Sequence, residues 1–112
     1  MRPDYTINPL ELDRALALPS ALPRSRVVDG YNTPAVYAWR DADTGEVVYV
    51  GKALRVRNRL MRHWYASQWL IDWLSTGAVP IVDVWIVAAQ DRAGIERSMI
   101  DAHCPRYNRR RD

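Results

Sequence analysis

The stretch AVYAWRDADTGEVVYVGKA, residues 35–53, decides the fold of this chain. It holds two runs rich in valine and aromatic residues, 35–39 and 46–50, separated by a polar loop that contains Gly45. Valine and tyrosine favour extended strands, and glycine supplies the positive φ that a short hairpin loop needs. The stretch therefore predicts an antiparallel β-hairpin.

The residues after the hairpin predict one or two helices. Gly51 interrupts the second strand, and the next glycine in the chain is Gly77. Between them the apolar residues recur at the spacing of an amphipathic helix: Leu54, Leu60, Met61, Trp64, Ile71 and Leu74. We expect helical structure over this segment, with a break near Ser67.

A third strand and a last helix complete the predicted domain. Residues 79–89 are apolar on both faces apart from Asp83, which is typical of a buried strand. Asp91 is expected to cap a helix that ends near His103, because Pro105 disfavours helix in the residue before it. The pattern predicts a small α+β domain with a three-stranded, mostly antiparallel sheet flanked by helices.

The chain has 112 residues, which is enough for one domain. Residues 1–33 are rich in proline and are expected to form an N-terminal arm with one short helix between Asn8, its N-cap, and Leu18. Residues 34–108 form the predicted domain. Residues 109–112 form a basic tail.

Composition excludes disorder and argues against a membrane protein. Hydrophobic residues make up 48% of the chain and charged residues 26%, as in ordinary globular proteins. The longest apolar run, residues 84–89, is far shorter than the roughly 20 residues that span a bilayer, and no charged-then-apolar leader follows Met1. The single cysteine, Cys104, cannot form an internal disulfide. We expect an intracellular protein.

Positive charge is concentrated in one part of the chain. The net charge is +3, and residues 52–63 hold five basic side chains without one carboxylate. Such a run indicates a polyanionic partner such as nucleic acid, although a solvated helix face is an equally good interpretation.

Two hairpin tyrosines and the following residues could form a phosphate site. Tyr37 and Tyr49 lie on the paired strands, where tyrosine more often serves only for cross-strand packing. Gly51 allows close approach of a ligand, and Lys52 places a cation at the strand-to-helix junction. Such a junction suits a phosphate group.

Arg55, Arg59 and His63 are spaced four residues apart, so a helix would place them on one face. A guanidinium and an imidazole on that face could hold a phosphodiester and transfer a proton. The alternatives are a solvated Arg59 and a histidine that simply packs beside Trp64.

These residues, with Glu96 and the terminal segment 105–108, resemble the GIY-YIG endonuclease family over residues 34–108. The densest part of the match, residues 48–53, is similar to the N-terminal incision domain of the excision-repair subunit UvrC. His63 instead resembles the homing and restriction branches of the family.

One position departs from the family pattern. Ala35 stands where the first motif has glycine. Because the tyrosine of that motif carries the chemistry, we expect a packing adjustment around Ala35 and no loss of activity.

The resemblance implies a metal-dependent endonuclease that cuts DNA to 5′-phosphate and 3′-hydroxyl ends. It implies that Glu96 binds one Mg²⁺ or Mn²⁺, which fits the preference of hard cations for carboxylate oxygen. The alternative for Glu96 is an exposed ion pair with Arg92 one turn earlier. The implied catalytic residues are Tyr37, Tyr49, Lys52, Arg59, His63, Glu96 and Asn108.

Each implied role meets one need of phosphodiester hydrolysis. Tyr37 is the expected base for the attacking water, with Lys52 lowering its pKa. Tyr49 orients water or phosphate, Arg59 neutralises charge on the nonbridging oxygens, and His63 shuttles the proton. The amide of the terminal asparagine is expected to tie the C-terminal segment to the site.

The expected partner is DNA, contacted through Gly51, Arg55, Arg62, Arg106, Arg109 and Arg110. Phosphate contacts do not read bases, so a protein partner or a homodimer is expected to supply specificity. Two other functions stay open: a nucleic-acid-binding module that does not cut, and a nuclease for RNA or branched structures. The tryptophans are expected in the core: Trp64, Trp69, Trp73 and Trp85.

Overall fold

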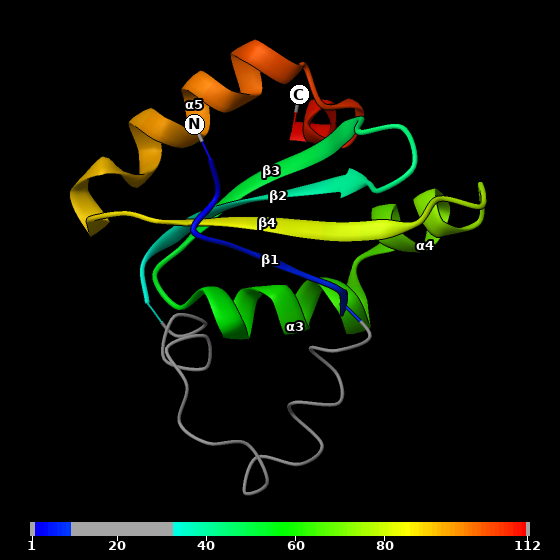
Figure 1. Cartoon of the computed structure of the whole chain (residues 1–112), viewed down its shortest axis with the longest axis horizontal. Helices are drawn as coiled ribbons and strands as arrows, with labels where there is room; N and C mark the ends of the chain where they lie inside the picture. The colour runs from blue at the N-terminus through cyan, green and yellow to red at the C-terminus, as the bar shows by residue number, and fades with distance from the viewer. Residues whose placement is uncertain (1, 10–32, 112) are drawn as a thin grey trace, which may run out of the picture.

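The computed structural model describes residues 2–9 and 33–111. Four antiparallel strands form one sheet in the order β1-β4-β2-β3 (Figure 1). The predicted α+β class is therefore confirmed, but the number of strands was wrong. The strands are β1 (Tyr5–Ile7), β2 (Ala35–Asp41), β3 (Val47–Ala53) and β4 (Pro80–Ile86).

The additional strand, β1, comes from the segment expected to be an arm. Three residues are too few to show a strand periodicity, and only pairing with β4 makes the segment extended. Asp4 contributes to this pairing, because its carboxylate accepts a hydrogen bond from the Ile86 N–H at 2.6 Å. Thr6 adds a hydrogen bond from its hydroxyl to Asp83 at 2.7 Å. The predicted helix ending at Leu18 falls mainly outside the described residues.

The hairpin has the predicted form. β2 and β3 pair antiparallel, with Tyr37 opposite Gly51 and Trp39 opposite Tyr49. Gly45 has a φ of 77° in the loop between the strands, as its position predicted. This register places Tyr37 and Tyr49 diagonally on the same face, with ring centroids 6.4 Å apart.

The helices cover both faces of the sheet (Figure 1). α3 (Val56–Ala66) and α4 (Gln68–Leu74) pack on one face and meet at Ser67, where the break was predicted. α5 (Arg92–His103) packs on the other face. Two short 3-10 helices flank α5: η1 (Ala89–Asp91) and η2 (Arg106–Arg111).

The ends of α5 differ in how well they were predicted. Asp91 occupies the N-cap position, but its side chain makes no capping hydrogen bond because η1 continues directly into α5. At the other end Cys104 adopts a left-handed conformation with φ 48°, and its N–H bonds the Ile100 carbonyl at 2.8 Å. The predicted end near His103 is confirmed. Within the described residues, no helix has the length and apolarity that crossing a membrane would require.

Candidate active site

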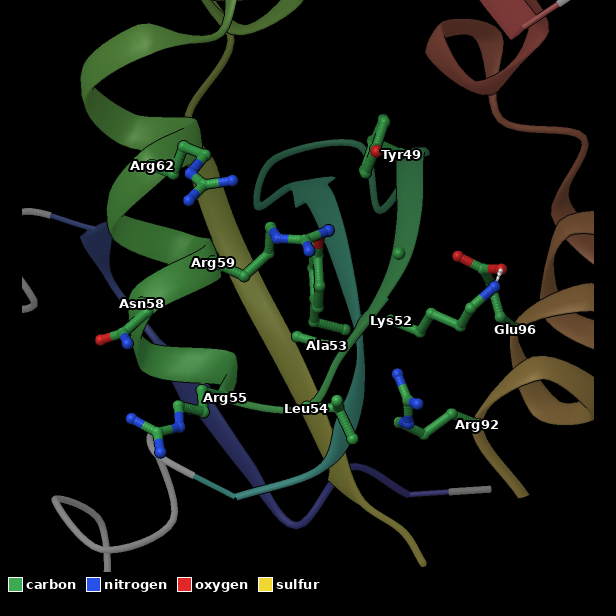
Figure 2. Close-up of a pocket in the computed structure, with 12 residues that line it drawn as sticks. Tyr49, Lys52, Ala53, Leu54, Arg55, Asn58, Arg59, Arg62, Arg92 and Glu96 are labelled. Carbon is green, nitrogen blue, oxygen red and sulfur yellow. Dashed lines mark hydrogen bonds and ion pairs between the residues drawn. The ribbon is translucent and has the colours of Figure 1, made fainter. Parts of the chain in front are cut away.

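A pocket of about 520 Å³ lies between α3, β3 and the N-terminal part of α5 (Figure 2). Basic side chains from α3 face the pocket from one side, and β3 and α5 supply the opposite side. The lining residues are Tyr37, Tyr49, Gly51, Lys52, Ala53, Leu54, Arg55, Asn58, Arg59, Arg62, Arg92 and Glu96. Residues from four elements, up to 59 positions apart, thus share one cavity.

Tyr37 is the most buried of the pocket's polar residues, and Gly51 makes room for it. A Cβ atom on Gly51 would lie closer to the Tyr37 hydroxyl and ring than real contacts allow. From the sequence we expected that the absence of a side chain at Gly51 lets a ligand approach the backbone closely. The structure shows that Gly51 first of all accommodates the phenol on the neighbouring strand.

The predicted cause of Tyr37 activation was wrong. Burial is the largest influence and raises the pKa of Tyr37 above its ordinary value of about 10. Arg59 is the cation that opposes this shift in the Tyr37 pKa, through its charge and a hydrogen bond. The Lys52 ammonium instead pairs with Glu96. The phenol is therefore neutral at pH 7 and needs a proton acceptor.

His63 is positioned to be that acceptor. Its Nε2 lies 2.7 Å from the Tyr37 hydroxyl, and its Nδ1 lies 2.9 Å from Oγ of Ser67. Burial, together with the charges of Arg59 and Arg62, lowers the pKa of His63 to about 4, so the imidazole is neutral at pH 7. Both ring nitrogens are hydrogen-bonded, which is more specific than packing beside a tryptophan.

Tyr49 is held by an aromatic neighbour. Its ring stacks on Trp69 at a centroid distance of 4.6 Å and an interplanar angle of 5°. Trp69, Trp73 and Trp85 are buried and Trp64 is partly buried, so their expected place in the core is confirmed. The stacked pair fixes the orientation of the Tyr49 ring at the pocket lining.

Glu96 and Lys52 form an ion pair on one side of the pocket (Figure 2). Lys52 Nζ donates to Glu96 Oε1 at 3.1 Å, and only 8% of Glu96 is exposed. The alternative of an exposed pair with Arg92 is therefore wrong. Arg92 Nε instead donates to the Ala89 carbonyl at 3.0 Å, while its side chain lines the pocket.

The chain matches a known family of protein domains. Residues 33–109 match the family described as the UvrC-like GIY-YIG domain. The chain belongs to this family of GIY-YIG endonuclease domains. The resemblance found from the sequence is thereby confirmed.

Curated relatives and solved structures are similar to this chain over most of its length. UvrABC system protein C of Chlorobium phaeobacteroides is 32% identical over 91 residues, which are 79% of this chain and 14% of that protein. The protein of the same name from Chlamydia caviae is 32% identical over 68% of this chain and 13% of its own length. The chain thus spans about one seventh of these relatives.

The crystal structure of the N-terminal GIY-YIG endonuclease domain of UvrC from Thermotoga maritima, bound to magnesium, shows the same fold. The TM-score is 0.57 at 20% identity, covering 77% of this chain and 98% of that one. This likeness shows the fold of the domain.

Asn108 contacts the site region from outside the pocket. Its Oδ1 accepts a hydrogen bond from the Val50 N–H at 2.8 Å, and its Nδ2 donates to the Val50 carbonyl at 2.8 Å. The expected tie between the C-terminal segment and the hairpin is therefore present. Because Asn108 reaches the backbone of β3 and not the cavity, its position is that of a positioning residue.

The structure divides the basic residues of the GIY-YIG domain into two groups. Arg55, which is the N-cap of α3, and Arg59 and Arg62 within the helix all line the pocket. Of the residues whose spacing of four predicted one helix face, Arg55 and Arg59 line the pocket and His63 lies behind it against Tyr37. The Arg59 side chain extends into the cavity, whereas the Arg55 guanidinium turns away from it (Figure 2). Arg106 lies outside the pocket lining and pairs with Glu46 at 2.6 Å. The side chains of Arg109 and Arg110 lie outside the described part of the structure.

Sequence reasoning missed two polar residues of the pocket. Asn58 lies three positions after Arg55 and four before Arg62, so the same helical periodicity could have found it. Arg92 lies four positions before Glu96 on α5 and was considered only as its ion-pair partner. Ala35, which stands where the first family motif has glycine, is fully buried, and Tyr37 still lines the cavity.

Proposed function

We propose that this GIY-YIG domain is a divalent-metal-dependent endonuclease that hydrolyses DNA phosphodiester bonds to 5′-phosphate and 3′-hydroxyl ends. One observation carries the proposal: a phenol, a guanidinium, an ammonium and a buried carboxylate line the same polar pocket. They supply the groups that activate water and neutralise charge during phosphodiester hydrolysis. The magnesium bound to the related domain of Thermotoga maritima UvrC supports the metal requirement.

The residues present fit a single hard cation bound at Glu96. Within residues 2–9 and 33–111 no group of three or more metal-ligating side chains gathers, which argues against a closed, all-protein site. Mg²⁺ keeps several waters and is commonly bound by one or two carboxylates together with substrate phosphates. Bound there, Mg²⁺ or Mn²⁺ would supply Lewis-acid stabilisation of the phosphate and the leaving oxygen.

Arg59 is the residue best placed to hold the scissile phosphate. It projects from α3 into the pocket, opposite the wall formed by Lys52 and Glu96 (Figure 2). A guanidinium can bind two phosphate oxygens at once and so fix the orientation of the group. Lys52 also contributes by holding the Glu96 carboxylate in position at 3.1 Å.

Tyr37 and His63 form the route for the proton. The attacking water transfers a proton to the Tyr37 oxygen, and Tyr37 transfers its own proton to Nε2 of His63, 2.7 Å away. Burial and, after it, the charges of Arg59 and Arg62 lower the pKa of His63. A bound phosphate offsets the two arginine charges, which raises the basicity of the imidazole when substrate is present. Tyr49 orients the water or the phosphate from the adjacent strand.

DNA is the substrate that the charge of the pocket favours. Arg55, Arg62 and Arg92 add to Arg59 and Lys52 along the lining, and such clusters bind the phosphate backbone with a strong salt dependence. These contacts position a duplex without reading its bases. We therefore also propose that a protein partner or a second copy of the chain supplies specificity; the relatives' name, UvrABC system protein C, is consistent with a partner.

Nicking of supercoiled plasmid with and without Mg²⁺ tests the proposed activity. Glu96→Gln should abolish metal-dependent nicking, because the cation loses its only proposed protein ligand. Glu46→Gln is the matched control, since Glu46 is exposed and pairs with Arg106 away from the pocket. Both variants should unfold at nearly the wild-type urea concentration.

The same assay separates the two other candidate functions. Plasmid binding without metal-dependent nicking would show a nucleic-acid-binding module and remove the enzyme proposal. Faster cleavage of RNA, flaps or junctions than of matched duplex would keep the chemistry and change the substrate.

A further inference from the structure

Ser67 contacts His63 through both its backbone and its side chain. Its Oγ lies 2.9 Å from Nδ1 of His63, and its N–H donates to the His63 carbonyl at 3.1 Å. Ser67 is the residue at which α3 ends and α4 begins, with an extended backbone of φ −88° and ψ 121°. At the helix break the Ser67 hydroxyl therefore faces the His63 imidazole.

The two hydroxyls around His63 differ in acidity. A neutral imidazole carries one proton, so one ring nitrogen donates a hydrogen bond and the other accepts one. A phenol O–H is intrinsically a stronger hydrogen-bond donor than an aliphatic O–H, whereas the alcohol oxygen is the better acceptor. Burial raises the Tyr37 pKa by disfavouring the phenolate, which leaves this difference between the neutral groups unchanged. This difference favours donation from Tyr37 to Nε2 and from Nδ1–H to Ser67.

We propose that Ser67 is a positioning residue that holds His63 as the Nδ1–H tautomer and so keeps Nε2 free to receive the Tyr37 proton. In this tautomer a lone pair of the Tyr37 oxygen is available to the attacking water. In the opposite tautomer Nε2–H would donate to Tyr37, and the phenol could not release its proton to the ring. This inference rests on the proposed nuclease function.

The proton balance is complete within these residues. One proton passes from water to the Tyr37 oxygen, and the phenolic proton passes to Nε2, so the resulting imidazolium donates from Nδ1 to Ser67. The reverse transfer restores the neutral ring after the product leaves. The groups that face His63 are Tyr37 from β2, Tyr49 from β3, and the charges of Arg59 and Arg62 on α3.

Nitrogen NMR of the imidazole tests the tautomer directly. The chain holds two histidines, and His103 is exposed on α5, so a full chain with His103→Gln and labelled histidine reports His63 alone. We expect Nδ1 to carry the proton in this chain at pH 7. Ser67→Ala should shift the population toward the Nε2–H tautomer, and Ser67→Thr should retain the original one because it keeps a hydroxyl.

Single-turnover nicking across a pH series gives the second measurement. We expect Ser67→Ala to lose about tenfold in rate, a part of the roughly 10²- to 10⁴-fold that general acid–base catalysis supplies, and to show a displaced pH profile. Ser67→Thr should restore both. Ser75→Ala is the matched control: the Ser75 hydroxyl also lies at a helix end, but it donates to the Asp72 carbonyl at 2.6 Å and not to an imidazole.

Two results would overturn the inference. One is an Nε2–H tautomer in the chain with Ser67 intact, which decides the matter even if Ser67→Ala fails to fold. The other is a Ser67→Ala variant with unchanged tautomer, rate and pH profile. A chain that never nicks DNA would instead refute the proposed function, and the spectrum would still decide the tautomer.

Discussion

The two faces of the sheet are built from different kinds of side chain. The face under α3 and α4 carries aromatic rings, including Tyr37, Trp39 and Tyr49. The face under α5 carries aliphatic residues and a single tryptophan: Val36, Ala38, Val50 and Trp85. Polar side chains of the site occur mainly on the aromatic face, and α5 adds Glu96 from the other layer. The pocket lies where the layers meet, so aromatic packing orients the reactive groups and aliphatic packing sets the distance to the carboxylate.

The largest effect expected from this comparison is a pH-dependent loss of stability on the aromatic face. The folded pKa of His63, about 4, lies below its unfolded value of about 6.5, so the unfolded chain binds the proton first. The contribution is complete above pH 6.5 and is lost as the pH falls toward 4. It amounts to about 3 kcal/mol.

Urea unfolding between pH 4 and 7 measures this contribution. His63→Gln should weaken the pH dependence of the unfolding free energy in this interval. His103→Gln should leave it unchanged, because His103 is exposed on α5. Equal slopes for the chain and His63→Gln would contradict the assigned pKa.

Next in size is the effect of adding a methyl group on either side of the sheet. Gly51→Ala should destabilise the fold by about 2 kcal/mol, as overpacking does, because its Cβ collides with Tyr37. Gly94→Ala, on α5, should stabilise the fold by about 0.5–1 kcal/mol, since nothing lies within 4 Å of the new Cβ. Urea midpoints measure both changes. A neutral Gly51→Ala would show that the phenol moves aside at no cost.

A smaller effect is expected where the C-terminal segment joins β3. Asn108→Ala removes two hydrogen bonds to Val50 and should cost about 1–2 kcal/mol. Asn58→Ala, at an exposed position of α3, should not lower the unfolding free energy, because alanine has the higher helix propensity. Amide exchange at Val50 would show whether the loss is local, and unaltered protection there would contradict the assignment.

Local signals predicted most of the fold. The Gly45 loop, the helix break at Ser67 and the helix end before Pro105 each depend on residues close in sequence, and each was located correctly. β1 was missed because three residues acquire their extended form only from pairing with β4.

The sequence predicted which residues belong to the candidate site better than it predicted the contacts between them. Spacing and the family resemblance brought forward Tyr37, Arg59 and Glu96, which line one cavity. The Lys52–Glu96 pair joins residues 44 positions apart, and no sequence pattern signals such a contact. The direction of the Tyr37 pKa shift was missed for a related reason: burial depends on what the whole fold packs around a side chain.

The side-chain amide of Asn108 also affects whether another chain can add a strand to the edge of the sheet. β3 is an outer strand of the sheet, and Asn108 satisfies both main-chain groups of Val50 much as a further strand would. The opposite margin is β1, only three residues long. Edge strands that are short, or whose main-chain groups are already hydrogen-bonded, offer few free groups for strand addition by another chain. A strand from another chain could therefore pair with β3 at Val50 only by displacing Asn108.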